Sequence, residues 1–252
     1  MTIHPTAIID PNATIESNVQ IGAYAVIGAK VELADNCIID PHVVIHGPTR
    51  IGSGCHIHSH SVIGDSPQTT RSAADSQALI IGAGSIIREF VTLNRGEEKA
   101  TVIGDNCLIM AYSHVAHDCQ LGDRCVLANG AQLAGHVQVE DGVTFGGMCG
   151  VHQFVRIGRL AMIAGGSMVT QDVPPFALVQ GDRAQIRGIN RIGLRRNHIS
   201  SEHINTINQS FKHLFLRADA PDDTQFLAQL MAFNLNSRRG LCGYHQHAFQ
   251  VP

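Results

Sequence analysis

Residues 3–45 read IHPTAIIDPNATIESNVQIGAYAVIGAKVELADNCIIDPHVVI, and an aliphatic residue recurs in this stretch at every sixth position. The period continues to residue 63, returns briefly after residue 80, and then runs from residue 103 to residue 169. The positions are Ile3, Ile9, Ile15, Ile21, Ile27, Leu33, Ile39, Ile45, Ile51, Ile57, Ile63, Ile81, Ile87, Leu93, Ile103, Ile109, Val115, Leu121, Leu127, Leu133, Val139, Phe145, Val151, Ile157, Ile163 and Val169. An α-helix repeats about every 3.6 residues and a strand about every two, so neither gives this period. It is typical of a hexapeptide parallel β-helix, with one short strand per repeat.

A second class of residue supports the same register, because a small or β-branched residue lies four positions after each aliphatic one, as Ala7, Ala13, Val19, Ala25 and Val31 do. Turn-forming pairs such as Ser17-Asn18, Asp35-Asn36 and Asp105-Asn106 fall between the two classes. Asparagine and aspartate tolerate the positive φ that sharp corners need. Three repeats form one coil, so residues 18 apart are expected to stack at strand spacing, roughly 4.8 Å.

Polar segments near residues 64–80 and 94–101 interrupt the period, and Pro174-Pro175 ends it. Proline cannot donate to a strand ladder. Loops longer than roughly 12–15 residues in a compact domain are usually functional or disordered. We therefore predict a mostly β fold. Residues 1–175 are expected to form a left-handed parallel β-helix of hexapeptide repeats with these two loop insertions. Residues 176–252 are expected to form a small C-terminal α-helical domain with an irregular tail.

The period becomes helical after residue 200. One helix face is predicted from Ile204, Ile207, Phe211, Leu214 and Phe215, with Ser200 or Ser201 as the N-cap. A second helix is predicted to start near residues 222–224 and to bury Phe226, Leu227, Leu230 and Met231. Residues 240–252 show no pattern, and such chain ends are often disordered.

Charge is distributed unevenly along the chain. Residues 1–182 hold 9 Lys/Arg against 17 Asp/Glu, whereas residues 183–252 hold 9 Lys/Arg against 4 Asp/Glu. An anionic partner is therefore expected near the C-terminal end, although a basic face can also be merely solvated.

Cysteine usage and hydropathy bear on the compartment. Six of the seven cysteines fall in the small-residue class and are predicted to be buried packing residues. No pair has CxxC spacing, which argues against structural zinc. Unpaired thiols, an N-terminus that enters the repeat at once, and the lack of a run of about 18 apolar residues together predict a cytoplasmic protein without a membrane span.

Histidine carries the candidate chemistry. His117 and Asp118 are adjacent, and a step of 18 residues leads from them to Gly135 and His136. Asp118 is therefore expected to lie against His136, and His117 against Gly135, one coil apart. An imidazole held by a carboxylate can accept a proton near neutral pH, and an exposed glycine N–H can stabilise an oxyanion. The column predicts an acid–base site.

Four segments resemble UDP-N-acetylglucosamine acyltransferases, namely HVAHDC (114–119), LAGHV (133–137), GMCGVHQF (147–154) and QDVPP (171–175). The resemblance covers about residues 3–217. It implies transfer of a 3-hydroxyacyl chain from acyl carrier protein to the 3-hydroxyl of UDP-N-acetylglucosamine, the first step of lipid A biosynthesis. It further implies His117 as general base, Asp118 as the residue that orients it and Gly135 N–H as the oxyanion donor. No metal and no cofactor are expected, and neither is a nucleic-acid partner.

The resemblance also implies a set of substrate contacts and a homotrimer. His136, His152 and Gln153 would line the nucleotide-sugar pocket, with His114 beside the base. Gln68 and Arg71 would lie near the donor or the phosphates, Asn190, Arg195 and Arg196 at the nucleotide end, and Gly166 where acyl length is set. Arg183, Arg187, Arg191 and Arg195 are four apart, and on one helix they would form a basic stripe suited to an acidic carrier protein.

Alternatives remain open at this stage. Asn94 and Ile192 depart from the family pattern at the acceptor end, which keeps a 3-amino analogue of the sugar nucleotide as a possible acceptor. His114 and His117 also suggest a zinc hydratase of the γ-carbonic anhydrase type. A non-enzymatic β-helix scaffold is the third alternative, but it would not explain the ordered His–Asp–Gly–His column.

Overall fold

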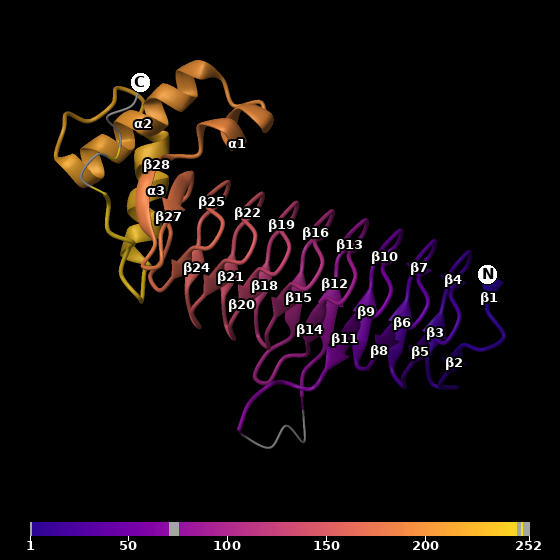
Figure 1. The fold of residues 1–252 in the computed structure, drawn as a ribbon. Helices are drawn as coiled ribbons and strands as arrows, with labels where there is room; N and C mark the ends of the chain where they lie inside the picture. The colour runs from indigo at the N-terminus through magenta and orange to yellow at the C-terminus, as the bar shows by residue number, and fades with distance from the viewer. Residues whose placement is uncertain (1, 71–75, 246–247, 249–252) are drawn as a thin grey trace.

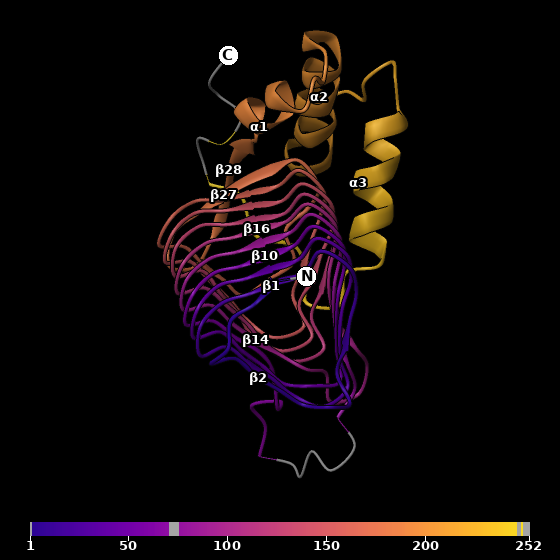
Figure 2. The same cartoon turned by 90° about the vertical axis from the view of Figure 1, so that its right-hand side faces the viewer.

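The computed structural model describes residues 2–70, 76–245 and 248. The chain winds into a triangular prism of stacked coils, seen from the side in Figure 1 and nearly along its axis in Figure 2. The described residues form three sheets, of 11, nine and eight strands, and each coil contributes one strand to each sheet in turn. The predicted left-handed parallel β-helix with C-terminal helices is confirmed.

We call the three faces sheets A, B and C. Sheet A contains β1 (Thr2–Ile3), β4 (Gln20–Ile21), β7 (Ile38–Ile39), β10 (His56–Ile57), β13 (Ile86–Ile87), β16 (Leu108–Ile109), β19 (Val126–Leu127), β22 (Thr144–Phe145), β25 (Met162–Ile163), β27 (Ala177–Gln180) and β28 (Gln185–Ile189). Sheet B contains β2 (Ile8–Ile9), β5 (Val26–Ile27), β8 (Val44–Ile45), β11 (Val62–Asp65), β14 (Thr92–Asn94), β17 (His114–Val115), β20 (Gln132–Leu133), β23 (Gly150–Val151) and β26 (Met168–Val169). Sheet C contains β3 (Thr14–Ile15), β6 (Val31–Leu33), β9 (Thr49–Ile51), β12 (Leu79–Ile81), β15 (Thr101–Ile103), β18 (Gln120–Leu121), β21 (Gln138–Val139) and β24 (Arg156–Ile157).

The register of the strands follows the sequence period. Ile3 pairs with Ile21, and Leu127 pairs with Phe145, so partners are 18 residues apart in both regular blocks. The insertion at 64–78 lengthens the step from Ile51 to its partner Ile81, and the shorter one at 95–100 lengthens the step after it. Both insertions leave the prism between sheets B and C, and the described ends of the longer one project from it below β14 in Figure 1. The stack therefore absorbs the loops without losing register.

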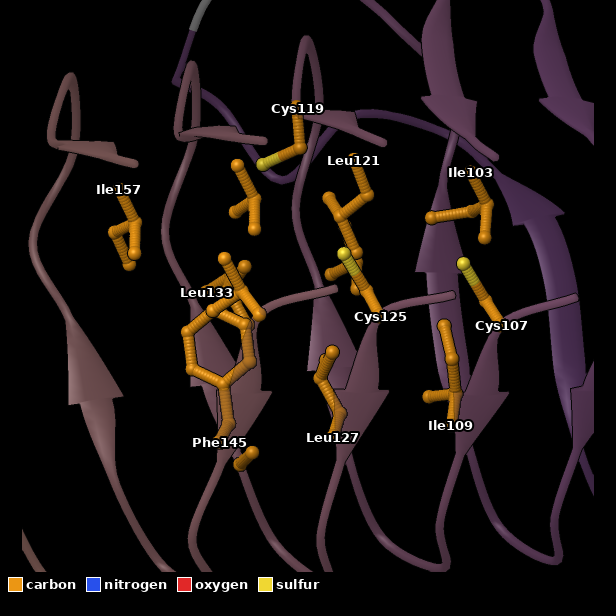
Figure 3. Close-up of a cluster of buried hydrophobic side chains, with 14 of the residues drawn as sticks. Ile103, Cys107, Ile109, Cys119, Leu121, Cys125, Leu127, Leu133, Phe145 and Ile157 are labelled. Atoms are coloured by element: carbon orange, nitrogen blue, oxygen red, sulfur yellow. The ribbon is translucent and has the colours of Figure 1, made fainter. Parts of the chain in front are cut away.

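The core is the stacked aliphatic column together with the small-residue column, and Figure 3 shows its central part. All seven cysteines are free and buried, as predicted for the six that lie in the repeat. Burial raises the pKa of Cys55 and of Cys119 to about 12, so these thiols stay protonated at neutral pH. They act as small apolar residues whose S–H groups donate to backbone carbonyls, as Cys119 Sγ does to Ala134 O at 3.1 Å.

The corner between sheets A and B differs from the expected turn chemistry. Asn18, Asn36 and Asn106 have positive φ at the corner between sheets C and A, as predicted. The A–B corner instead places aromatic residues in the left-handed region, each ring stacked on the next with centroids 5.0–5.2 Å apart. The column is Tyr24, His42, His60, Phe90 and Tyr112. Ring stacking along the prism offsets the backbone cost of positive φ in these residues.

The strand ladder continues beyond Pro175, where the repeat was expected to end. β27 pairs with β25 in parallel, and β28 then pairs with β27 antiparallel. Three helices follow, α1 (Arg191–Arg196), α2 (Ser201–Leu216) and α3 (Gln225–Leu235). α1 and α2 cover the end of the prism, and α3 lies along its side. Ser200 caps α2 by accepting a hydrogen bond from His203 N–H, which confirms one of the two predicted caps.

Two details of the C-terminal prediction are wrong. Arg187 lies in β28 and Arg191 in α1, so the four arginines do not form one helical stripe. Met231 is half exposed, and Phe233 takes its place in the buried face of α3. After residue 240, Leu241 and Tyr244 form β-bridges with Asp172 and Ile186. Within the described ranges, no helix is long and apolar enough to cross a membrane.

Candidate active site

The acid–base cluster, which we define as His117, Asp118 and His136, lies at the corner where sheet B turns into sheet C. His117 Nδ1 lies 2.7 Å from Asp118 Oδ2, within hydrogen-bond distance. Because an ionised carboxylate only accepts hydrogen bonds, the proton of this bond belongs to Nδ1. Nε2 is then left as the basic nitrogen. The side chain of His117 is 14% exposed, so solvent reaches the ring only from one side.

Asp118 is fully buried and is held by the backbone of the second insertion. Its carboxylate accepts hydrogen bonds from the N–H groups of Glu97, Glu98 and Lys99 at 3.2, 2.9 and 2.7 Å. Burial alone would raise the pKa of Asp118. The hydrogen bonds from Lys99, His117 and the two glutamate amides outweigh burial and hold this pKa below its ordinary value. The carboxylate is therefore charged at neutral pH and orients His117.

Gly135 faces the His117 ring from the next coil, as the 18-residue step predicted. A Cβ atom at this position would lie 2.8 Å from His117 Nε2 and 2.7 Å from Cε1, so any side chain here would displace the ring. In the part of the chain that the structure describes, no hydrogen bond occupies the Gly135 N–H. The glycine thus provides both the space for the base and an unused donor close to it.

His136 and His114 flank the base in different ways. His136 Nε2 lies 3.7 Å from Asp118 Oδ2, which confirms their predicted contact, and its ring stacks on Phe154. His114 Nδ1 lies 2.7 Å from Thr92 Oγ1. Burial lowers the pKa of His114, and the hydrogen bond with Thr92 opposes that shift while the proximity of His117 adds to it. His114 is therefore a neutral hydrogen-bonding group beside the base.

A cleft of about 550 Å³ opens over sheet B beside His117. Six residues predicted from the sequence line this cleft: Gln68, His114, His117, Gly135, His152 and Gln153. Its apolar lining comes from sheet B and the residues next to it, including Leu133, Val151, Met168 and Val169. An apolar groove that ends at a base suits an acyl chain whose reactive end meets His117.

Several predicted residues lie away from this cleft. Asn190, Arg195 and Arg196 line a second cleft of about 620 Å³ over sheet A, next to α1. Gly166 lies at the A–B corner with φ +68° and open space around it. His136 packs behind His117 rather than lining the cleft. Arg71 lies outside the described residues.

Sequence reasoning missed the residues that support Asp118. Glu97, Glu98 and Lys99 act through their backbone N–H groups, and Thr101 Oγ1 accepts the Asp118 N–H at 2.8 Å. Their only signal in the sequence was the break in the hexapeptide period itself. A short insertion one coil before a candidate acid therefore predicts a segment whose backbone can reach that acid.

The donors around Asp118 also bear on the zinc-hydratase alternative. His117, Asp118 and His136 offer three ligand atoms within 4.8 Å of one another. However, the two carboxylate oxygens of Asp118 already accept four hydrogen bonds, from three amides and His117. Amide N–H groups pointing at the carboxylate neutralise the charge that a cation would need. The donor set fits a held base better than a metal ligand.

The fold and this site define a hexapeptide-repeat acyltransferase. The family model described as bacterial transferase hexapeptide (six repeats) matches residues 1–35, 30–65 and 100–135, and the model described as UDP N-acetylglucosamine O-acyltransferase, domain 2, matches residues 172–242. The chain belongs to the family of acyl-[acyl-carrier-protein]–UDP-N-acetylglucosamine O-acyltransferases.

Relatives and solved structures carry that assignment over almost the whole chain. The protein of that name from Aliarcobacter butzleri is 43% identical over 95% of this chain and 97% of its own length. The one from Herminiimonas arsenicoxydans is 43% identical over 95% of this chain and 98% of its own. The structure of UDP-N-acetylglucosamine acyltransferase from Campylobacter jejuni superposes with a TM-score of 0.90 at 36% identity, covering 97% of this chain and 100% of that one.

Proposed function

We propose that this protein transfers a 3-hydroxyacyl chain from acyl carrier protein to the 3-hydroxyl of UDP-N-acetylglucosamine, with His117 as the general base. The observation that carries the mechanism is the 2.7 Å contact between His117 Nδ1 and the buried carboxylate of Asp118. It leaves Nε2 basic beside the cleft. The names of the relatives supply the donor and the acceptor.

The proposed reaction is a direct transfer. His117 Nε2 removes the proton of the sugar 3-hydroxyl while that oxygen attacks the carbonyl carbon of the thioester. The tetrahedral oxyanion accepts a hydrogen bond from Gly135 N–H. When the carbon–sulfur bond breaks, the imidazolium returns its proton to the sulfur of the carrier, and the ester remains on the sugar. Asp118 stays ionised throughout and stabilises the imidazolium.

The same assay tests the acceptor and the base. Wild type should acylate UDP-N-acetylglucosamine, and His117→Ala should reduce kcat/KM by about a hundredfold or more, the range of a general base. His60→Ala, at the exposed A–B corner, is a matched control that should retain activity. Equal activity of His117→Ala and wild type would overturn the mechanism. Transfer by folded wild type only to the 3-amino analogue would replace the acceptor and leave the mechanism standing.

We further propose that the working unit is a homotrimer in which the substrate lies between subunits. The cleft with His117 opens over sheet B, whereas the cleft with Asn190, Arg195 and Arg196 opens over sheet A of the same prism. Two faces of one prism cannot both contact one small substrate. If sheet A of one subunit faces sheet B of the next, closed three-fold symmetry brings the two clefts together.

Complementation between two inactive variants tests this arrangement. His117→Ala and Arg195→Ala should each transfer slowly as pure proteins. Mixed trimers are formed by co-expression with two separable tags. Some of their sites combine an intact His117 from one subunit with an intact Arg195 from the other. Their activity should exceed the sum of the two variants alone. If sedimentation shows a monomer, or if the mixed oligomers gain nothing, the shared site is wrong while the role of His117 is unaffected.

A further inference from the structure

A second group of histidines and a carboxylate lies outside the cleft. The open cluster, which we define as Asp40, His56 and His58, stands on sheet A toward its A–B corner, at β7 and β10. His117 follows β17, which is on sheet B and further along the prism. The open cluster is therefore separate from both the acid–base cluster and its cleft, and the proposed transfer does not use it.

The ligand atoms of the open cluster converge without bonding to one another. His56 Nε2 lies 3.1 Å from Asp40 Oδ1, and His58 Nδ1 lies 3.2 Å from Asp40 Oδ2. Neither contact has hydrogen-bond geometry, and His56 Nε2 is buried without any hydrogen-bond partner. A ring nitrogen that close to a carboxylate oxygen would normally share a proton with it. The two imidazole rings stack on each other with centroids 3.9 Å apart, and each presents one nitrogen to a different oxygen of Asp40.

The spacing suits a small divalent transition metal. Zinc binds imidazole nitrogen and carboxylate oxygen at about 2.0–2.2 Å, so neighbouring ligands of a tetrahedral ion lie about 3.3 Å apart. The two contacts to Asp40 are close to that value. In the single chain, the side chains of His56, His58 and Asp40 are 32, 20 and 27% exposed, while the ligand atom His56 Nε2 is itself buried. Glu89 Oε1 lies 3.8 Å from His58 Nδ1, but both Glu89 oxygens accept hydrogen bonds from the Arg88 guanidinium, so Glu89 is not counted among the ligands.

We propose that Asp40, His56 and His58 bind one zinc ion or a related divalent transition metal on sheet A. Asp40 follows β7, whereas His56 and His58 belong to β10 and the residue after it. The ion thus links adjacent coils of the prism. An ion held by side chains of two adjacent coils strengthens the interface between them. Bound metal also adds to the free energy of unfolding by mass action. Cysteine spacing gave no sign of this site, because it uses imidazole and carboxylate ligands.

Metal titration of the full-length protein tests the proposal. Tag-free, chelator-treated protein is titrated with zinc in competition with a chromophoric chelator, and cobalt absorption reports the coordination geometry. Wild type should bind one zinc per chain in the micromolar range or tighter, and its Tm should rise on loading. His56→Ala/His58→Ala should weaken binding by at least about a hundredfold. Asp40→Asn, which keeps the side-chain shape, should also weaken zinc binding. It serves as the test variant if the double variant proves unstable.

Two control variants make the result specific. His42→Ala/His60→Ala removes two histidines from the same two coils and should leave zinc binding unchanged. His117→Ala/His136→Ala removes the imidazoles of the acid–base cluster and should also leave it unchanged. The proposal is overturned if wild type binds no zinc in this range, if the open-cluster variants bind as wild type does, or if binding is lost with the acid–base cluster instead. Acyl transfer by metal-free wild type and by the open-cluster variants should be retained.

Discussion

The acid–base cluster and the open cluster contain the same kinds of residue and differ in what holds the carboxylate. Asp118 is buried and accepts three backbone amides besides His117. Asp40 is partly exposed and lies near two imidazoles without a hydrogen bond to either. Backbone amides that saturate a carboxylate make it a fixed partner for one imidazole. A carboxylate without them keeps its lone pairs for an ion. The amides of the insertion at 94–101 therefore distinguish the two clusters, and we propose that they decide which chemistry each cluster performs.

The largest effect should come from the stack that carries both clusters. Leu127 is fully buried and pairs with Ile109 and Phe145 in the aliphatic column. Leu127→Asp places a charge in that column at a cost of several kcal/mol or more, so we expect no soluble folded protein. Gln138→Asp adds the same charge at an exposed position and should express normally. Wild-type yield and Tm for Leu127→Asp would mean that the register is wrong.

A matched pair of substitutions separates the two carboxylates. Asp118→Asn removes the charge that orients His117 and should lower kcat/KM by about a hundredfold or more. Asp40→Asn makes the same chemical change in the open cluster and should leave transfer within error of wild type. Steady-state kinetics of the two variants, with circular dichroism to confirm folding, checks the pair. Equal losses of kcat/KM in the two variants would mean that both carboxylates support the transfer.

Acid stability tests whether Asp118 is held in its charged form. Its pKa is lower in the folded protein than in the unfolded chain, so its contribution is complete above the ordinary aspartate value of about 3.9. The contribution is lost as the pH falls through the lower folded-state pKa. The difference in Tm between wild type and Asp118→Asn should therefore be constant near neutral pH and shrink in acid. A difference that grows as the pH falls would show that the pKa is raised.

The smallest effect should come from the Glu97 side chain. Its Oε2 lies 4.0 Å from His117 Nδ1, beyond hydrogen-bond distance, whereas Asp118 Oδ2 lies 2.7 Å from the same nitrogen. Glu97→Gln retains the backbone N–H that Asp118 accepts, so kcat/KM should change by no more than about fivefold. A loss as large as that of Asp118→Asn would mean that the Glu97 side chain, and not the three backbone N–H groups bound by Asp118, supports the base.

The period of six was sufficient to predict the prism and one half of the site. Adding 18 to Asp118 gave His136, and adding 18 to His117 gave Gly135, because stacked coils convert sequence separation into contact. The same step leads from Asp40 to His58, so the open cluster could also have been found in this way. Side chains that stack within the regular coils are therefore open to prediction.

What could not be predicted depends on the backbone or, in the proposed trimer, on how subunits meet. The three amides that donate to Asp118 are backbone N–H groups, which every residue but proline possesses, so no residue type marks them in the sequence. The arginines after residue 182 have helical spacing, but pairing with β27 makes the first part of that stretch a strand. Asn190 lies over a different face from His117, and a single sequence carries no signal for how faces of separate subunits meet.

The tautomer of His117 tests the central claim most directly. In protein labelled with nitrogen-15 at histidine, proton–nitrogen correlation spectra distinguish a proton on Nδ1 from one on Nε2, and the missing signals of His117→Ala assign the ring. With neutral imidazole, the amide-held carboxylate of Asp118 predicts a proton on Nδ1 and a bare Nε2, and Asp118→Asn should disturb that preference. A neutral ring that carries its proton on Nε2 in wild type would contradict the proposed base.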